Sequence, residues 1–136
     1  MDPFIKTSKP KLGNTRRYFM VVNFPNSTKL LETAEAENLY GNLVAQLIKD
    51  FGLANIFIEL SEGIMPEDLK KVIHEKVYVL IVEKFADYLN LLYIIDVPEN
   101  TVKAIEAIDV VEVADEVTFL ILKREWQKVW FKAKYN

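Results

Sequence analysis

The sequence predicts a mainly α fold (α+β), with about four helices and a small two-strand element near the N-terminus. Apolar residues recur every three or four positions over two long stretches, and carboxylates occupy helix-start positions further along the chain. The 136 residues contain only 4 Gly and 5 Pro, which indicates few and long elements. A hydrophobic content of 51% is typical of a globular chain with a buried core.

The N-terminal region is predicted to be a basic extended arm. Residues 1–17 contain Pro3, Pro10 and Gly13 and show no apolar periodicity. Residues 18–136 are predicted to form a single globular domain, because the length suits one domain and is too short for two.

Two short segments have the composition of strands. Tyr18–Phe24 is β-branched and aromatic. Asn55–Leu60 alternates, with Ile56, Ile58 and Leu60 on one side. These segments are the predicted two-strand element.

The first predicted helix begins at about Thr33 and ends at Phe51. Its apolar stripe repeats at helical spacing and consists of Leu39, Leu43, Leu47 and Phe51, with Val44 and Ile48 beside them. Gly52 follows directly and is predicted to take the left-handed conformation that ends many helices.

The second predicted helix is long and unbroken, and it begins at Pro66 with acidic residues in its first turn. One face stays apolar throughout: Leu69, Val72, Ile73, Val77, Leu80, Ile81, Phe85, Tyr88 and Leu89. Tyr78, Val79 and Val82 fall outside this stripe. The helix is therefore predicted to be buried on more than one side, or to meet a partner.

Two capping boxes follow, each with a carboxylate three residues before a glutamate. Asp96 and Glu99 predict a short helix over Glu99–Ile108, and Asp109 and Glu112 predict the start of the last helix. That last helix is acidic at its start and basic at its end, which complements the helix dipole.

Two segments of the C-terminal half carry a resemblance to a known group. Leu89–Glu99 (LNLLYIIDVPE), followed by Ala114–Lys128 (ADEVTFLILKREWQK), resembles small helical proteins of unknown function from several bacterial groups. These typically pair a Leu-Leu-Tyr-x-Ile-Asp-Val-x-Glu stretch with a later Arg-x-x-x-Lys helix, and Ile94 stands here where a basic residue is usual. The resemblance implies a helical fold and no particular activity.

Charge is distributed unevenly along the chain. Residues 1–17 hold five basic residues and one acid, and residues 123–136 do the same, so each end carries +4. Residues 18–122 hold seven basic and 18 acidic residues, a charge of -11, and the total is -3. We expect the basic ends to contact an acidic surface, first that of the same protein or its copy.

The residues needed for common catalytic sites are missing from the sequence. The chain has no Cys, no glycine-rich phosphate loop and no H-E-x-x-H motif. Its single histidine, His74, could transfer protons with Glu75 or form a pH-sensitive contact, but a half-exposed boundary position is the favoured interpretation. We predict that the protein is not an enzyme and that it holds no cofactor and no metal.

The cellular compartment is predicted from two signals that the sequence does not show, an export signal and a membrane-spanning helix. Nothing resembles an export signal, and no apolar run approaches the ~20 residues of a membrane-spanning helix. We expect a soluble, cytoplasmic protein.

The aromatic and basic C-terminal tail supplies the candidate binding residues. Trp126 and Trp130 are predicted to pack on the domain or on another subunit, ahead of binding a separate protein, nucleic acid or a membrane surface. The candidate partner-binding residues are Trp126, Trp130, Tyr78, Val79 and Val82. The candidate nucleic-acid-binding residues are Lys123, Arg124, Lys128, Lys132 and Lys134.

These observations predict a non-catalytic interaction module. We expect it to self-associate as a homo-oligomer or to dock into a larger bacterial assembly. The alternative is a nucleic-acid-associated protein that uses the basic N-terminal arm and the basic aromatic C-terminal helix. The acidic body and a sequence pI of 5.3 place that alternative second.

Overall fold

A computed structural model describes residues 23–135, and within this range the chain is mainly helical, as predicted. There are six helices in these residues, which is more than the predicted four, and no strand. Their bounds are α3 Ser27–Ala36, α4 Tyr40–Leu53, α5 Pro66–Glu83, α6 Phe85–Ile95, α7 Glu99–Lys103 and α8 Val110–Tyr135. The predicted arm at residues 1–17 lies outside the described range. None of the described helices is both long and apolar enough to span a bilayer.

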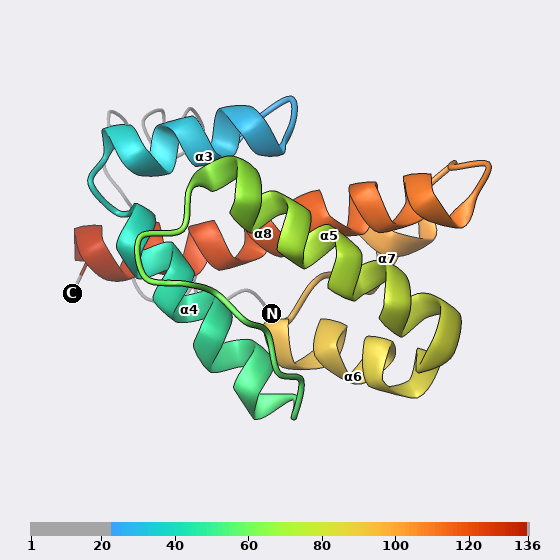
Figure 1. The fold of residues 1–136 in the computed structure, drawn as a ribbon. Coiled ribbons are helices and arrows are strands. Elements are labelled where there is room, and N and C mark those ends of the chain that lie inside the picture. The colour runs from blue at the N-terminus through green and yellow to red at the C-terminus, as the bar shows by residue number, and fades with distance from the viewer. Residues whose placement is uncertain (1–22, 136) are drawn as a thin grey trace.

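The C-terminal helix α8 is the centre of the fold. It contacts each of the helices α3 to α7. In Figure 1 it spans the width of the molecule behind α4 and α5, with α3 above it and α6 below. Trp126 and Trp130 are fully buried in its C-terminal half, together with apolar residues of every long helix. The tail is therefore one face of the hydrophobic core.

Three helices end in the same way, and none of them uses glycine to do so. Asn38, Asn55 and Asp96 have φ angles of 58°, 61° and 69°, in the left-handed region that Asn and Asp enter more readily than other non-glycine residues. At the end of α4 the N–H of Ile56 donates to the carbonyl of Phe51 at 2.9 Å, which closes a Schellman motif. The prediction for Gly52 was wrong: this residue lies inside α4, and Asn55 takes the left-handed position.

The first predicted helix is in fact two helices. α3 begins at Ser27, where the side chain of Asn26 accepts a hydrogen bond from the Lys29 N–H at 2.9 Å. α3 ends before the left-handed Asn38, and α4 begins at Tyr40 in a new direction. The apolar spacing of the sequence continues past this point, but a left-handed residue cannot continue a right-handed helix.

The long second helix is also interrupted. α5 ends at Glu83, and Lys84 has φ -141° and ψ 62°, outside the helical region. The positions three and four after buried Leu80 are Glu83 and Lys84, so the apolar stripe has no apolar residue to bury there. Because the chain turns at Lys84, α6 packs against both α4 and α5 and buries Tyr88 and Leu91.

Asn55–Leu60 does not form a strand, which corrects the prediction. The segment is irregular, yet Ile56 and Ile58 are buried while Phe57 is exposed. The alternation of buried and exposed residues therefore arises because the extended segment lies across the core. Residues 23–135 contain no neighbouring strand with which it could pair. The other predicted strand, Tyr18–Phe24, falls almost entirely outside the described residues.

Only the second capping box forms. The Glu112 N–H donates to Asp109 Oδ1 at 2.9 Å, and Glu112 Oε2 accepts from the Ile108 N–H at 3.1 Å. Asp96 instead ends α6, and α7 begins after Pro98 without a side-chain cap. α7 stops at Lys103, so the predicted helix over Glu99–Ile108 is shorter than expected.

Substituting Asp109→Ala is expected to lower the free energy of unfolding by about 1 kcal/mol, because it removes the side-chain acceptor at the start of α8. Urea denaturation of the wild type and the variant would measure the loss. Glu116→Ala, an exposed change on the same helix, is the control and should change stability by less than about 0.5 kcal/mol. Equal losses in the two variants would show that the cap is not responsible.

Candidate functional site

The predicted partner-binding residues separate into two groups. Trp126 and Trp130 are buried in the core of this chain, so they are not part of its described surface. Val79 and Val82 are exposed near the end of α5, and Tyr78 is half-buried. The exposed pair lies in the last turns of α5, before the turn into α6, where Phe85 is also exposed.

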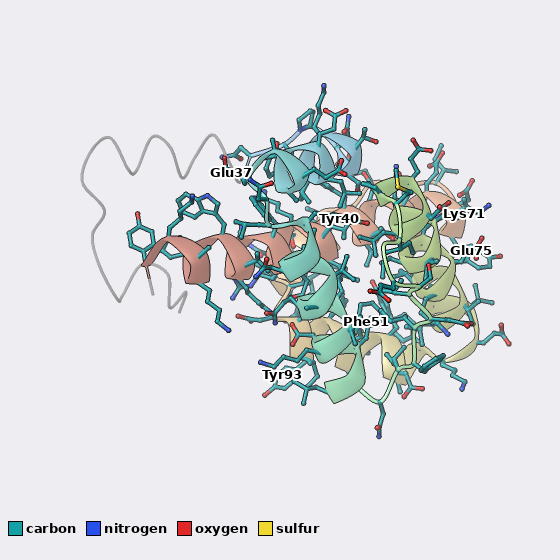
Figure 2. The ribbon with its side chains drawn as sticks, turned by 60° about the vertical axis from the view of Figure 1, so that its left-hand side comes forward. Glu37, Tyr40, Phe51, Lys71, Glu75 and Tyr93 are labelled. Atoms are coloured by element: carbon teal, nitrogen blue, oxygen red, sulfur yellow. The ribbon has the colours of Figure 1, made fainter. Side chains whose placement is uncertain are left out.

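Phe85, Leu89 and Tyr93 form an exposed line along α6, which we call the α6 stripe. Their spacing of four residues places them on one side of the helix, and they are 54%, 51% and 81% exposed. Figure 2 shows Tyr93 projecting away from the helix bundle, whereas Phe51 of α4 points into it. Phe85 and Leu89 were predicted to lie on the buried stripe of one long helix, and the turn at Lys84 leaves them exposed.

A groove of about 440 Å³ lies beside the C-terminal half of the α6 stripe. Leu89 and Tyr93 line it from α6, and Pro98 and Val102 line it from the segment that follows. Leu92 and Val97, both buried, also line it. The lining is mostly apolar, so this groove can accept an apolar or aromatic side chain.

Arg124, one of the five candidate nucleic-acid-binding residues, is buried and bound to the end of α6. Its Nε donates to the carbonyl of Asp96 at 3.0 Å, and a terminal guanidinium nitrogen lies 3.0 Å from Asp96 Oδ2. This pair of contacts holds α8 to the segment that borders the groove.

Two of the lysines in the same set also bind carboxylates of this chain. Lys128 Nζ lies 2.8 Å from Asp50 Oδ2, and Lys134 Nζ lies 3.5 Å from Glu37 Oε1. Lys132 is exposed and Lys123 is half-buried. The basic C-terminal end therefore contacts the acidic body of its own chain, which is the arrangement that the charge distribution favoured.

The interior between α4 and α8 contains a group that we call the buried carboxyl cluster: Gln46, Asp50, Glu125 and Lys128. Asp50 is 4% exposed and Glu125 is fully buried. Lys128 Nζ lies 2.8 Å from Asp50 and 3.2 Å from Glu125 Oε2, so one ammonium group faces two carboxyls. The Gln46 amide donates to Asp50 Oδ2 at 3.0 Å.

The two carboxyls titrate in opposite directions. Burial raises the pKa of Glu125 to about 9, and hydrogen bonding with Asp50 adds to the rise against the opposing effect of Lys128. Burial also acts to raise the pKa of Asp50, but hydrogen bonds from Glu125, Lys128 and Gln46 hold it below its ordinary value. At neutral pH the cluster therefore contains a protonated Glu125, an ionised Asp50 and one lysine cation, with no net charge.

The cluster has the character of a structural site. The hollow beside Gln46 measures about 290 Å³, and its lining includes none of Asp50, Glu125 and Lys128. Among residues 23–135 no group of three or more acidic or histidine side chains is placed to hold a metal ion. The carboxyls can store one proton and link α4 to α8.

His74 lies at the junction of α5 and α8. Its Nε2 donates to the Val111 carbonyl at 3.2 Å, and its ring is half-buried. Glu75 lies on the outer side of α5, as Figure 2 shows, and is exposed. This placement matches the predicted boundary position.

The sequence signals for these sites differ in strength. Asp50 stands three residues after Leu47 and Glu125 three after Leu122, so both are carboxylates within an apolar stripe, and this pattern could have revealed the cluster. The sequence around Tyr93 contained no comparable pattern that would have predicted its exposure. No protein-family model, curated protein or solved structure matches the chain. Its function is therefore inferred from its own interior and surface.

Proposed function

We propose that this protein is a non-catalytic interaction module that binds another protein molecule through the α6 stripe and the groove beside it. The observation that carries the proposal is the exposure of three large apolar side chains in one line. Exposed apolar residues are common as single side chains, but a continuous apolar surface beside a groove is typical of an interaction site.

The composition of α6 supports this proposal. Asp87 is the one charged residue in its eleven positions. The buried cores of protein interfaces are depleted in charge and enriched in aromatic residues, which matches Phe85 and Tyr93. Another side of α6, about 100° to 160° around the helix from the middle of the α6 stripe, is occupied in the core by Tyr88, Leu91 and Ile95. A helix that is apolar on both sides is expected to pack against something on both sides.

The placement of the polar groups supports a non-catalytic role. Asp50 and Glu125 are buried, Asp50 is paired with Lys128 and Glu125 is protonated, and both serve the contact between α4 and α8. Arg124 serves a similar contact with Asp96. These side chains stabilise the domain that presents α6.

Tagged protein captured from a native lysate, with and without nuclease, is expected to retain a bound protein chain in both cases. Leu89→Glu should lose that chain, because it places a charge in the middle of the α6 stripe. Ile108→Glu is the matched control: Ile108 is 94% exposed and lies outside the stripe, so its substitution should leave capture unchanged. Circular dichroism would verify that both variants fold.

Two outcomes would overturn the proposal. Capture by Leu89→Glu equal to that of the wild type would show that α6 is not the binding surface. Loss of all bound protein after nuclease treatment would instead favour the nucleic-acid alternative.

A further inference from the structure

We infer that the partner is a second copy of this chain, with two α6 helices packed antiparallel about a twofold axis at Leu89. This inference rests on the proposed function and names its partner. The Phe85 side chain of each copy would then insert into the groove of the other copy.

The features along α6 are arranged so that its surface can complement itself. Phe85 lies exposed at the N-terminal end of the helix, and the groove lies beside the C-terminal half. A twofold interface uses one patch on both molecules, so the patch must complement itself. A projecting side chain at one end and a groove at the other meet this requirement.

The spacing of the α6 stripe fixes the register of the two helices. With Leu89 opposite Leu89 of the partner subunit, an antiparallel pair places Phe85 opposite Tyr93 of the partner subunit. Tyr93 forms one wall of the groove, so Phe85 is positioned at its opening. Each copy supplies one projecting ring and one groove, and the contact is therefore made twice.

Charge also favours α6 as the contact between two copies. Residues 18–122 carry -11, so two copies repel each other over much of their surface. α6 is an exception, because its single carboxylate, Asp87, is about 160° around the helix from the middle of the α6 stripe at 100° per residue. The groove adds Asp96, Glu99 and Lys103, but Asp96 lies 3.0 Å from Arg124 and Glu99 lies 3.0 Å from Lys103, so these charges are balanced within each copy. The α6 stripe itself carries no charge with which to select an acidic or basic partner.

The size of the contact sets the expected affinity. Two short helices with one inserted side chain each would bury on the order of 1,000 Å² in total, at the low end of specific interfaces. We expect a dimer that forms at micromolar concentration. Sedimentation velocity over a concentration series should show the wild type passing from monomer to dimer.

Cysteine cross-linking tests the register directly, because the chain has no cysteine of its own. Leu89→Cys, next to the axis, is expected to oxidise to a covalent dimer. Phe85→Cys mixed with Tyr93→Cys should form the mixed dimer in preference to either homodimer, since identical residues at these positions lie about 12 Å apart along the helix axis. Ile108→Cys is the exposed control and should remain monomeric.

Substitution tests the same surface in solution. Leu89→Glu is expected to raise the dimer dissociation constant at least tenfold, and Ile108→Glu should leave it unchanged. A wild type that stays monomeric throughout the series, or cross-linking of Ile108→Cys as efficient as that of Leu89→Cys, would overturn the inference. If the purified wild type is monomeric but captures a different protein through Leu89, the inference fails and the proposed function stands. If neither dimerisation nor capture depends on Leu89, both fail.

Discussion

We expect the free energy of unfolding to fall as the pH rises from about 5.5 to about 8.5, at up to about 1.4 kcal/mol per pH unit. The cause is Glu125, whose pKa rises from 4.5 to about 9 in the folded protein. Between these two values the folded state holds a proton that the unfolded chain has released. The folded state is therefore most stable at the acidic end of this pH window, and the free energy of unfolding decreases as the pH increases through it.

The Glu125→Gln variant should lose most of this pH dependence, because an amide has no proton to release. Glu116→Gln, an exposed change on the same helix, should keep it. Urea denaturation at three pH values would measure both. The lowered pKa of Asp50 acts below about pH 4, and the raised pKa values of Tyr40 and Tyr88 act above pH 10, so neither should contribute in this window. A wild type whose stability rises with pH over this range would contradict the assignment.

Lys128→Met is expected to lower the free energy of unfolding by about 3 kcal/mol at neutral pH. The lysine lies 2.8 Å from an ionised and buried Asp50, and methionine keeps its apolar length while removing its charge. An unpaired carboxylate would then remain in the interior, where it is much less stable than in water. Chemical denaturation would give the difference from the wild type.

The control and the rescue separate charge from packing. Lys132→Met, one turn further along α8 at an exposed position, should change stability by less than about 0.5 kcal/mol. The double variant Lys128→Met, Asp50→Asn should recover much of the loss, because both members of the ion pair are then neutral. If the double variant is as unstable as Lys128→Met alone, packing of the lysine stem matters more than its charge.

Local signals predicted the parts of the fold that depend on neighbouring residues. The Asp109 box could be recognised because its acceptor and donor are three residues apart. The tail helix followed from charge order and apolar spacing. The breaks at Asn38 and Lys84 did not follow, because neither site has a glycine or proline and the decision depends on which helix packs against which. A periodic stripe shows which side of a helix is apolar, but it does not fix where one straight helix becomes two.

The buried carboxyl cluster shows the corresponding limit for sites. Asp50 and Lys128 are 78 residues apart, so their contact exists only after α4 and α8 are packed together. The sequence does contain one indication of the cluster: Asp50 and Glu125 are carboxylates at positions where the apolar stripes of α4 and α8 would place apolar residues. The α6 stripe was not predicted because its residues fit the expected apolar pattern and gave no sign of being exposed. Only the turn before α6 decides which of these residues face water.

The central position of α8 has a consequence for synthesis of the chain on the ribosome. The helices α3 to α7 emerge first, and each leaves the surface that it packs against α8 uncovered until that helix has been made. Translation of its 26 residues takes roughly one to five seconds at 5–20 residues per second. During this interval the nascent chain exposes apolar surface that attracts chaperones or other nascent chains. Folding of this domain is therefore expected to be completed late, and a chain that stops before Val110 is expected to aggregate.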